Sequence, residues 1–156
     1  MIKKFLISSF CIFLFTSCGF KVAEIEKLSN YYISEVTSSG DSRINYKLKN
    51  KLMQNAIGNN KKPIIINLKT VKTKTIKEKN IKNEITKYNL NISITVDIKE
   101  ENKSILKSFT LKENGSFAVK TKHSDSLNNE KKLIADLSNK LSNQIQNRIT
   151  TILNNI

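Results

Sequence analysis

The strongest pattern in the chain is a strict alternation of apolar and polar residues over residues 88–99. Because successive side chains of a strand point to opposite faces, this period of two predicts a strand with one buried face and one wet face. The buried face is expected to carry Tyr88, Leu90, Ile92, Ile94, Val96 and Ile98. The wet face is expected to carry Asn89, Asn91, Ser93, Thr95, Asp97 and Lys99.

Two strands are expected before this one. Residues 31–36 are rich in aromatic and β-branched residues, and the run 37–40 ends them with turn-forming residues. Pro63 then opens a strand whose residues Ile64, Ile66 and Leu68 share one face. Its end, up to residue 75, alternates Lys and Thr and is expected to project beyond the core while staying extended.

The connections around the alternating strand are polar. Residues 77–84 predict a hairpin tip before it, and residues 100–103 predict a turn after it. A fourth strand then begins at Ile105 and continues to Val119, with Asn114-Gly115 as a possible bulge or second turn.

Two amphipathic helices complete the pattern. In the first, apolar residues at a spacing of four share one face; Asp41 or Ser42 is expected to cap its start and Gly58 its end. Those apolar residues are Ile44, Leu48, Leu52 and Ala56. The second helix is expected over residues 127–153, with an unbroken stripe that fits packing on a sheet better than a coiled-coil seam. The stripe consists of Leu133, Leu137, Leu141, Ile145, Ile149 and Leu153.

The predicted order is β-α-β-β-β-α. The first strand, helix and second strand form a crossover, and the later strands are linked by hairpins. Each helix and the sheet have one apolar face, so the simplest packing is a two-layer sandwich. We therefore expect an α+β fold with two helices on one face of a four-stranded mixed sheet.

The first eighteen residues form a different kind of segment. Lys3 and Lys4 precede an apolar run at 5–15, and Thr16 and Ser17 precede Cys18, which is the layout of a secretory signal and resembles a bacterial lipobox. We expect residues 1–17 to be removed and Cys18 to carry acyl chains that anchor the protein to a membrane. A plain secretory signal, or a lone buried Cys18, is the alternative.

Removal of the signal leaves residues 18–156 as one domain, with 18–30 as its lipid-anchored N-terminal segment. Cys11 is lost with the signal, so we expect no free thiol and no disulfide in the mature chain. Gly19 follows the cysteine, where an enteric-type inner-membrane retention signal would have Asp, and this favours the outer membrane.

The formal net charge is +14, and +12 without Lys3 and Lys4. Such a charge suggests an anionic partner, and export argues against nucleic acid. The alternative is codon usage in an AT-rich genome, because Lys, Asn and Ile are abundant while Arg occurs only at Arg43 and Arg148.

No catalytic, metal-binding or cofactor-binding motif is visible, so we expect a non-enzymatic protein without a cofactor. The one histidine, His123, lies beside Ser124 and Asp125. Adjacent residues of a loop rarely reach triad geometry, so His123 is expected to be a surface loop residue rather than part of a small lipid-anchored hydrolase.

Several segments resemble the lipopolysaccharide-assembly lipoproteins of the LptE (RlpB) family. Cys18-Gly19-Phe20 is similar to the family's Cys-Gly-aromatic start, and residues 43–52 and 88–96 are similar to its first helix and its alternating strand. The ending over residues 141–149 is similar to the family's Leu-x-x-x-Ile-x-x-Arg-Leu. The resemblance covers essentially the whole mature chain.

The resemblance implies a function. Members of this family sit as a plug inside the outer-membrane barrel LptD, assist its assembly and help to deliver lipopolysaccharide to the cell surface. It also implies a ligand site near the hairpin tip predicted at 77–84 and the loop before the last helix. The basic residues there are Lys77, Lys79, Lys82, Lys120 and Lys122. If strands two and four run toward the same end of the sheet, the two loops meet there.

The charge alone leaves a second function open. A free, periplasm-facing lipoprotein could bind an anionic ligand or peptidoglycan without any barrel partner. Any one of the five lysines could also belong to an ordinary solvated surface.

Overall fold

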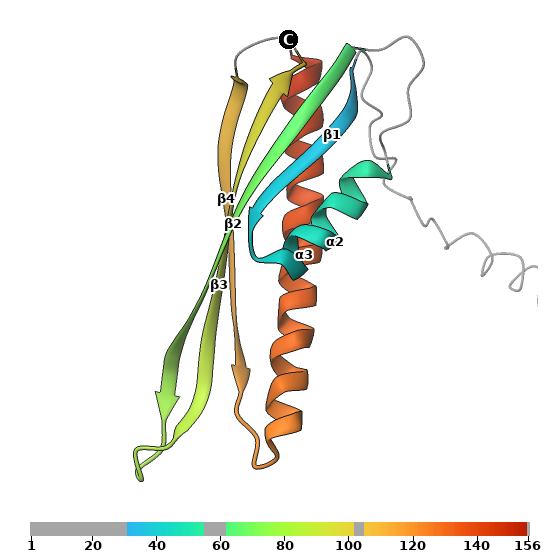
Figure 1. The fold of residues 1–156 in the computed structure, drawn as a ribbon. Helices are drawn as coiled ribbons and strands as arrows, with labels where there is room; N and C mark the ends of the chain where they lie inside the picture. Colours follow the sequence, from blue (N-terminus) through green and yellow to red (C-terminus); the bar gives the residue numbers. More distant parts are fainter. Residues whose placement is uncertain (1–30, 55–61, 102–104, 156) are drawn as a thin grey trace, which may run out of the picture.

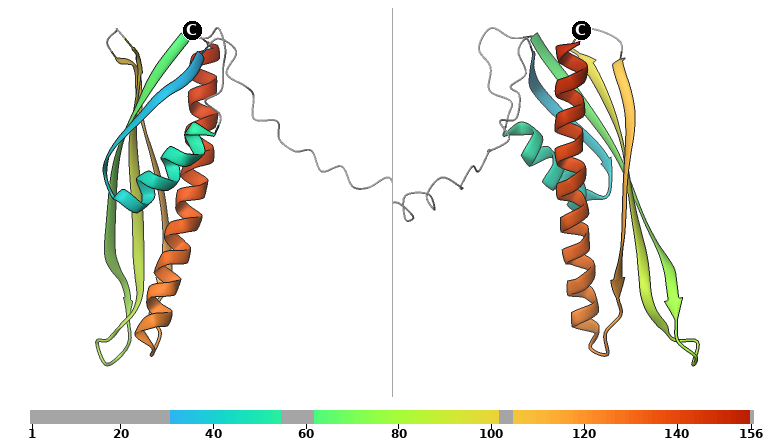
Figure 2. Two further views of the ribbon diagram at one scale, coloured as in Figure 1. Left: turned by 45° about the vertical axis from the view of Figure 1, so that its right-hand side comes forward. Right: turned by 180° about the vertical axis from the view of Figure 1, so that it is seen from behind.

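The computed structural model describes residues 31–54, 62–101 and 105–155. In chain order its elements are β1 (Tyr31–Gly40), α2 (Ser42–Met53), β2 (Lys62–Lys79), β3 (Ile85–Glu100), β4 (Ile105–Ala118) and α3 (His123–Asn154). The strands form one sheet, and both helices lie on the same face of it (Figure 1, Figure 2). The predicted β-α-β-β-β-α order and the α+β fold are confirmed.

The sheet is mixed, with the strand order β1-β2-β3-β4. β1 runs parallel to β2, and β3 runs antiparallel to both of its neighbours. β1 covers only the first part of β2, because the last pair between them is Gly40 with Thr70. Residues 71–79 of β2 therefore have β3 on one side and no strand on the other, and this half of β2 and β3 extends past β1 as a long hairpin (Figure 1).

The core lies between the sheet and α3. On β3 the alternating apolar residues from Leu90 to Ile98 are completely buried, which confirms the predicted buried face. The α3 stripe from Leu137 to Leu153 and the α2 residues Ile44, Leu48 and Leu52 cover them from the other layer. Each fully buried aliphatic side chain of this kind stabilises the fold by about 1.5–3 kcal/mol.

A second stripe on α3, which the apolar pattern does not reveal, faces α2. Ser138, Ser142 and Gln146 repeat at a spacing of four, so they share one side of α3, and all three are buried. Gln146 donates from Nε2 to the Lys51 carbonyl (3.1 Å), which satisfies a carbonyl of the last turn of α2. Because these residues are polar, sequence periodicity assigns them to the solvent although they are part of the interface between the helices.

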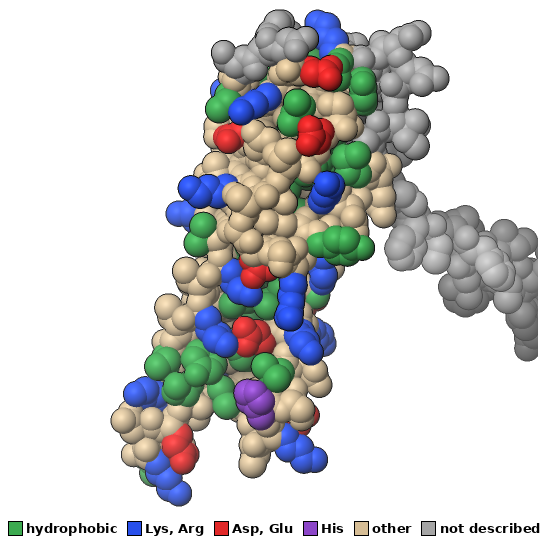
Figure 3. All heavy atoms as spheres, viewed as in Figure 1, with side chains coloured by type: hydrophobic (Ala, Val, Ile, Leu, Met, Phe, Trp, Pro, Cys, Tyr) green, Lys and Arg blue, Asp and Glu red, His purple; other side chains and the backbone are tan. Residues whose placement is uncertain are grey.

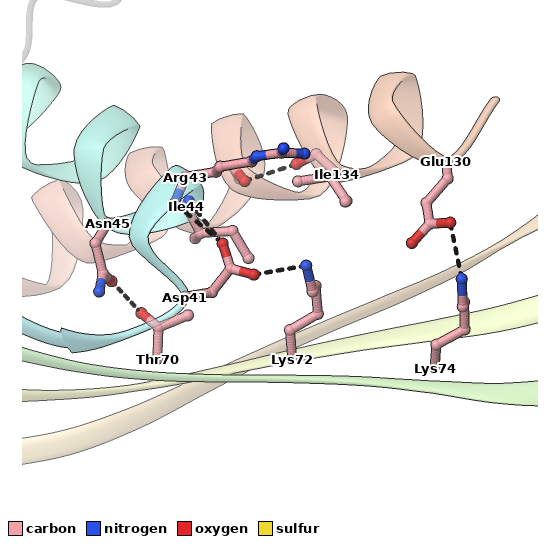
Figure 4. Close-up of polar contacts among 10 residues, drawn as sticks. Asp41, Arg43, Ile44, Asn45, Thr70, Lys72, Lys74, Glu130 and Ile134 are labelled. Carbon is pink, nitrogen blue, oxygen red and sulfur yellow. Dashed lines mark hydrogen bonds and ion pairs between the residues drawn. The ribbon is translucent and has the colours of Figure 1, made fainter. Parts of the chain in front are cut away.

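The connection from β1 to α2 is a tight turn fixed by polar contacts (Figure 4). Asp41 accepts hydrogen bonds from the backbone N–H groups of Arg43 (3.2 Å) and Ile44 (3.1 Å), so the predicted N-cap is confirmed. Gly40 has φ of 96°, and a Cβ there would lie 1.9 Å from the Thr70 carbonyl oxygen, so only glycine fits. Asn45 of α2 links this helix to both neighbouring strands, because its side chain donates to the Ser39 carbonyl of β1 and accepts from the Thr70 hydroxyl of β2.

Three local predictions were wrong. The turn expected at 37–40 is the end of β1, because β2 offers these residues a parallel partner. Asn114-Gly115 is neither a bulge nor a turn: both residues pair regularly with β3, and Gly115 instead leaves room for Leu133 of α3. His123 is not in a loop but is the first residue of α3, which begins four residues earlier than expected.

Other boundaries shift by a few residues. β2 continues through the first residues of the expected hairpin tip, which shortens the turn to Asn80–Glu84. The predictions for Ala56, Gly58, the signal at 1–17, Cys18 and the segment 18–30 lie outside the described residues.

Candidate functional site: the basic end of the sheet

The two loops that carry the five predicted lysines lie at the same end of the molecule (Figure 1). β2 and β4 both run toward this end, and Lys87 at the start of β3 pairs with Ala118 at the end of β4. Just beyond this pair, the Val119 N–H donates to the Thr86 carbonyl (2.9 Å). The strand connectivity therefore brings the β2–β3 turn and the β4–α3 connection together, as predicted.

Lys77, Lys79 and Lys82 lie on and beside the β2–β3 turn, and all three are exposed. Lys77 reaches across β3 and donates from Nζ to Ser116 Oγ of β4 (3.3 Å). Lys79, the last residue of β2, donates to Asn83 Oδ1 (2.9 Å).

The turn itself is held in one conformation by Asn80. Its Oδ1 accepts from the backbone N–H groups of Lys82 (3.0 Å) and Glu84 (2.9 Å), and its Nδ2 donates to the Glu84 carboxylate (2.7 Å). Asn83 has φ of 64°, a left-handed conformation that Asn tolerates better than most residues. Lys79 and Lys82 are thus attached to a pre-formed turn.

Lys120 and Lys122 lie in the connection between β4 and α3, and both are exposed. The Lys120 N–H donates to Ser126 Oγ (2.7 Å), which in turn donates to the Lys120 carbonyl (3.2 Å). Lys122 is the N-cap residue of α3, and its carbonyl accepts from the Asp125 N–H (3.1 Å). Ser126, which is buried, therefore fixes the backbone that carries both lysines.

At this end the acidic residues form ion pairs with other lysines than the five predicted ones. Lys87 pairs with Glu78 (2.8 Å), and the hydrogen bond from Lys87 lowers the pKa of Glu78, to which the charge of Lys77 also contributes. Lys74 pairs with Glu130 of α3 (2.9 Å). Within residues 31–54, 62–101 and 105–155, none of the five predicted lysines forms an ion pair. Their charges remain available to an anion.

Sequence reasoning missed an aromatic cluster beside these lysines. Tyr88 and Phe117 stack with ring centroids 5.7 Å apart. Lys74 Nζ lies 5.1 Å from the Tyr88 centroid and 5.9 Å from that of Phe117, within the range of cation–π attraction. The sequence contained a sign of this contact, because Lys74 continues the series of inward-facing residues of β2 that begins with Ile64. A lysine in that series was expected to face the solvent.

Apolar side chains are also exposed at this end. Ile81 at the tip of the turn is fully exposed, Ile76 of β2 is 52% exposed, and Leu127 on the first turns of α3 is 41% exposed. Figure 3 shows hydrophobic side chains interspersed with Lys side chains in this region. Lysines bind phosphates as point charges, and apolar side chains bind hydrocarbon, so this surface suits an anionic amphiphile.

The geometry around His123 does not assemble a triad. Ser124 Oγ donates to Asp125 Oδ1 at 3.5 Å, and all three side chains are exposed. Among the described residues, no hydrogen bond links His123 to either neighbour, and no cluster of His, Cys, Asp and Glu has the geometry to hold a metal ion. In the same part of the chain, no helix is both long enough and apolar enough to span a membrane.

Several bacterial lipoproteins of known structure share this architecture. Rare lipoprotein B from Shewanella oneidensis superimposes with a TM-score of 0.60 and 11% identity, over 80% of this chain and 98% of that chain. The chain has the rare lipoprotein B fold. The resemblance of the sequence to the LptE (RlpB) family therefore extends to the three-dimensional structure.

Two further structures agree. An uncharacterized lipoprotein B from Nitrosomonas europaea has a TM-score of 0.60 and 12% identity, over 78% of this chain and 82% of that chain. A minor lipoprotein from Acinetobacter baumannii has a TM-score of 0.58 and 16% identity, over 78% of this chain and 92% of that chain. No protein-family model and no curated protein sequence matches the chain. At identities of 11%, 12% and 16%, the likeness to these three proteins shows a shared fold.

Proposed function

We propose that the protein is a non-enzymatic lipoprotein of the outer membrane that plugs the LptD barrel, assists its assembly and takes part in lipopolysaccharide transport to the cell surface. The observation that carries the proposal is the rare lipoprotein B fold, which spans 98% of the Shewanella oneidensis chain. The lipobox-like sequence before Cys18 supports attachment to the membrane on the periplasmic side.

The outer face of the sheet fits a plug. Along β3 this face carries Asn89, Asn91, Ser93 and Thr95, all partly exposed, and Thr95 shares a hydrogen bond with Thr110 of β4 (3.0 Å). The lumen of a large outer-membrane barrel is polar, so its wall offers hydrogen-bond partners to such a face. A polar and mostly uncharged face can be enclosed without burying many unpaired charges.

The basic end supports the lipopolysaccharide part of the proposal. Lipopolysaccharide carries phosphates, which the five lysines without ion pairs would bind. Its acyl chains would contact Ile76 and Leu127, which are exposed at the same end of the molecule. This assignment predicts that binding weakens as salt rises, because exposed charges are screened.

Co-purification tests the plug. The tagged chain, extracted from outer membranes, should bring down a large barrel protein that mass spectrometry identifies as LptD, and that barrel should assemble poorly when the chain is depleted. Recovery of the chain without a barrel, together with normal barrel assembly in its absence, would refute the proposal.

A charge-reversal variant tests the ligand site separately. The variant Lys79→Glu, Lys82→Glu, Lys122→Glu should keep its circular dichroism spectrum and lose binding to lipopolysaccharide at low salt. The control variant Lys47→Glu, Lys49→Glu, Lys69→Glu changes the net charge equally at exposed positions of α2 and the upper part of β2, and it should retain binding. Equal binding by both variants would refute the site and leave the plug function standing.

The net charge of +14 also favours a second candidate, a free periplasm-facing lipoprotein that binds an anionic ligand or peptidoglycan. Protease treatment of intact outer membranes separates the two. A plug is protected until the barrel is removed, whereas a free lipoprotein is cleaved at the same rate with or without the barrel.

A further inference from the structure

Among the described residues the sheet has three unpaired strand edges, and their differences point to a second copy of this chain. The outer edge of β1 is ten residues long, and the pairing of β1 with β2 shifts register between Ile33 and Glu35. The second edge is residues 71–79 of β2, beyond the end of β1. The third is the outer edge of β4, over fourteen residues.

Within the described part of the chain, Asn129 Nδ2 is the one group outside the sheet that hydrogen-bonds to the backbone of the β4 edge, at the Ala118 carbonyl (3.2 Å). Gln144 Nε2 of α3 donates to the side chain of Glu113 (2.7 Å) and leaves the backbone of the edge unpaired.

The edge of β2 carries the features by which proteins oppose strand pairing. Lysines occupy four of its nine positions, and its register shifts between Ile76 and Glu78 and again before Lys79. Lysines and bulges on an edge strand discourage association with another strand. This edge is therefore unsuited to a partner strand.

The edge of β4 lacks these features. Its pairing with β3 is regular from Lys107 to Ala118, so the strand is long and continuous. Its charges are of both signs, with Lys107 and Glu113 on the helix-facing side and Lys112 on the outer side. A long, regular edge with unpaired backbone groups is a template for another strand.

We propose that two copies of the protein pair edge to edge through β4, antiparallel, about a two-fold axis at Thr110. In this register Lys107 of each copy lies opposite Glu113 of the other, and Phe109 lies opposite Leu111, on the same face of the sheet. Opposite charges and apolar pairs directly across two strands stabilise the pairing. A two-fold axis makes each favourable pair occur twice.

Neighbouring registers lack this complementarity. An axis at Lys112 places that residue opposite itself, so like charges meet. An axis at Leu111 places Glu113 opposite Phe109, and an axis at Phe109 places Glu113 opposite Ile105. Because the side-chain period is two, residues directly opposite each other share a face, and among these axes only the one at Thr110 pairs the acid with a base.

The outer face supports the same register. Lys112 of the second copy lies opposite Ser108, which donates to Asp97 Oδ1 of β3 (2.6 Å). The contact of Lys77 with Ser116 shows that a lysine of this sheet reaches across one intervening strand. Lys112 of the second copy can reach Asp97 across β4 in the same way. The pairing describes the free lipoprotein and does not rest on the proposed barrel function.

A cysteine at the axis tests the register. In the full lipid-anchored chain, Thr110→Cys should form a disulfide-linked dimer under mild oxidation, because directly opposed residues have Cα atoms about 4.5–5.5 Å apart. Ser108→Cys should not, since its two copies are offset by four residues, about 13 Å along the strands. Thr73→Cys on the β2 edge controls for pairing through that edge. The parent chain controls for Cys11 and Cys18.

A charge-swap cycle tests the contacts. Sedimentation of the full chain in detergent should show a concentration-dependent dimer, which Lys107→Glu or Glu113→Lys alone weakens about tenfold or more. The double variant Lys107→Glu, Glu113→Lys should restore wild-type dimerisation. A monomer at all concentrations, cross-linking through Thr73→Cys instead of Thr110→Cys, or a double variant no better than the single ones would overturn the proposal.

Discussion

The two halves of the long β2–β3 hairpin are made of the same strands but are stabilised in different ways. In the half beside β1, the inward residues Ile64, Ile66 and Leu68 of β2 are buried under both helices. In the half beyond β1, the inward positions hold Lys72, Lys74 and Ile76, and Ile76 is half exposed. One strand thus changes from a core strand to a surface strand along its length.

Thr70 marks the border between the two halves. It is buried and donates to Asn45 Oδ1 of α2 (2.7 Å). Beyond it, inward side chains contact the helices through charge: Lys72 pairs with Asp41 at the start of α2, and Lys74 pairs with Glu130 of α3 (Figure 4). The buried apolar residues of β2 are therefore concentrated in the half with β1, whereas in the half beyond it the buried apolar residues Leu90 and Ile92 come from β3 alone. The exposed residues of the basic half can vary at little cost to folding.

The largest expected effect is in the buried half. Ile94→Asp places a carboxylate at a position with no solvent exposure and should lower the free energy of unfolding by several kcal/mol, which is comparable with the whole stability of a domain. Asn91→Asp, on the outer face of the same strand, should have a mild effect. Chemical denaturation of both variants measures the difference, and equal losses would contradict the assignment of the two faces.

A smaller but still large effect is expected at Gly40. Gly40→Ala forces a side chain into a left-handed conformation and against the Thr70 carbonyl, so it should cost about 2 kcal/mol or more. Gly115→Ala meets only Leu133 Cδ1, the flexible end of a side chain, and should cost less. Thermal unfolding ranks the two variants, and the reverse order would show that β4 and α3 are packed more rigidly than the β1–α2 turn.

Asp41, at the border, should contribute a modest and pH-dependent amount. Partial burial disfavours its charge, but the hydrogen bond from Lys72 and the backbone N–H groups of Ile44 and Arg43 outweigh this and lower its pKa. The stabilisation of the fold by the ionised Asp41 carboxylate is therefore complete above the ordinary pKa of 3.8, and it is lost as the pH falls through the lowered pKa of the folded state.

Two variants separate the cap from the ion pair. Asp41→Ala should cost about 1 kcal/mol at neutral pH, whereas Asp41→Asn keeps a capping oxygen and loses the charge. Unfolding measured from neutral pH to pH 3 should show the wild type converging on Asp41→Asn. A constant difference across that range would mean that the Lys72 pair does not stabilise the fold.

The smallest effect is expected at the end of the basic half. Ile81 makes the tip of the turn and is fully exposed, so Ile81→Ser should change the free energy of unfolding by less than about 0.5 kcal/mol. Urea denaturation provides the measurement. A clear loss would show that the turn packs against another part of the molecule and that the contrast between the halves is overstated.

The buried apolar residues of the sheet and of α3 could be predicted from the sequence. The ion pairs in the half of β2 beyond β1 could not. The period of two on β3 and the spacing of four on α3 come directly from burial, and a buried face tolerates few polar residues. Lys72 and Lys74 occupy inward positions through ion pairs with residues far along the chain, and no local pattern reveals such partners. For the same reason Asn114-Gly115 suggested a bulge, because Leu133 of α3, which packs against Gly115, comes much later in the sequence.

The five lysines of the candidate site could be predicted only as a group. The strand directions brought their loops to one end, but the stacking of Tyr88 on Phe117 and the position of Lys74 over both rings depend on the β3–β4 register. That register is set by a long strand pair whose turn gives no strong signal.

The parallel pairing of β1 with only the first part of β2 has a consequence for local opening. Amide protons of Ile66 and Leu68 lie in a strand with neighbours on both sides and under two helices, whereas those of Thr73 and Thr75 lie in a strand with one neighbour. Hydrogen exchange along β2 should therefore become faster by orders of magnitude from its first residues to its last, although the backbone is extended throughout. A single strand would then report the free energy of global unfolding at one end and that of hairpin fraying at the other.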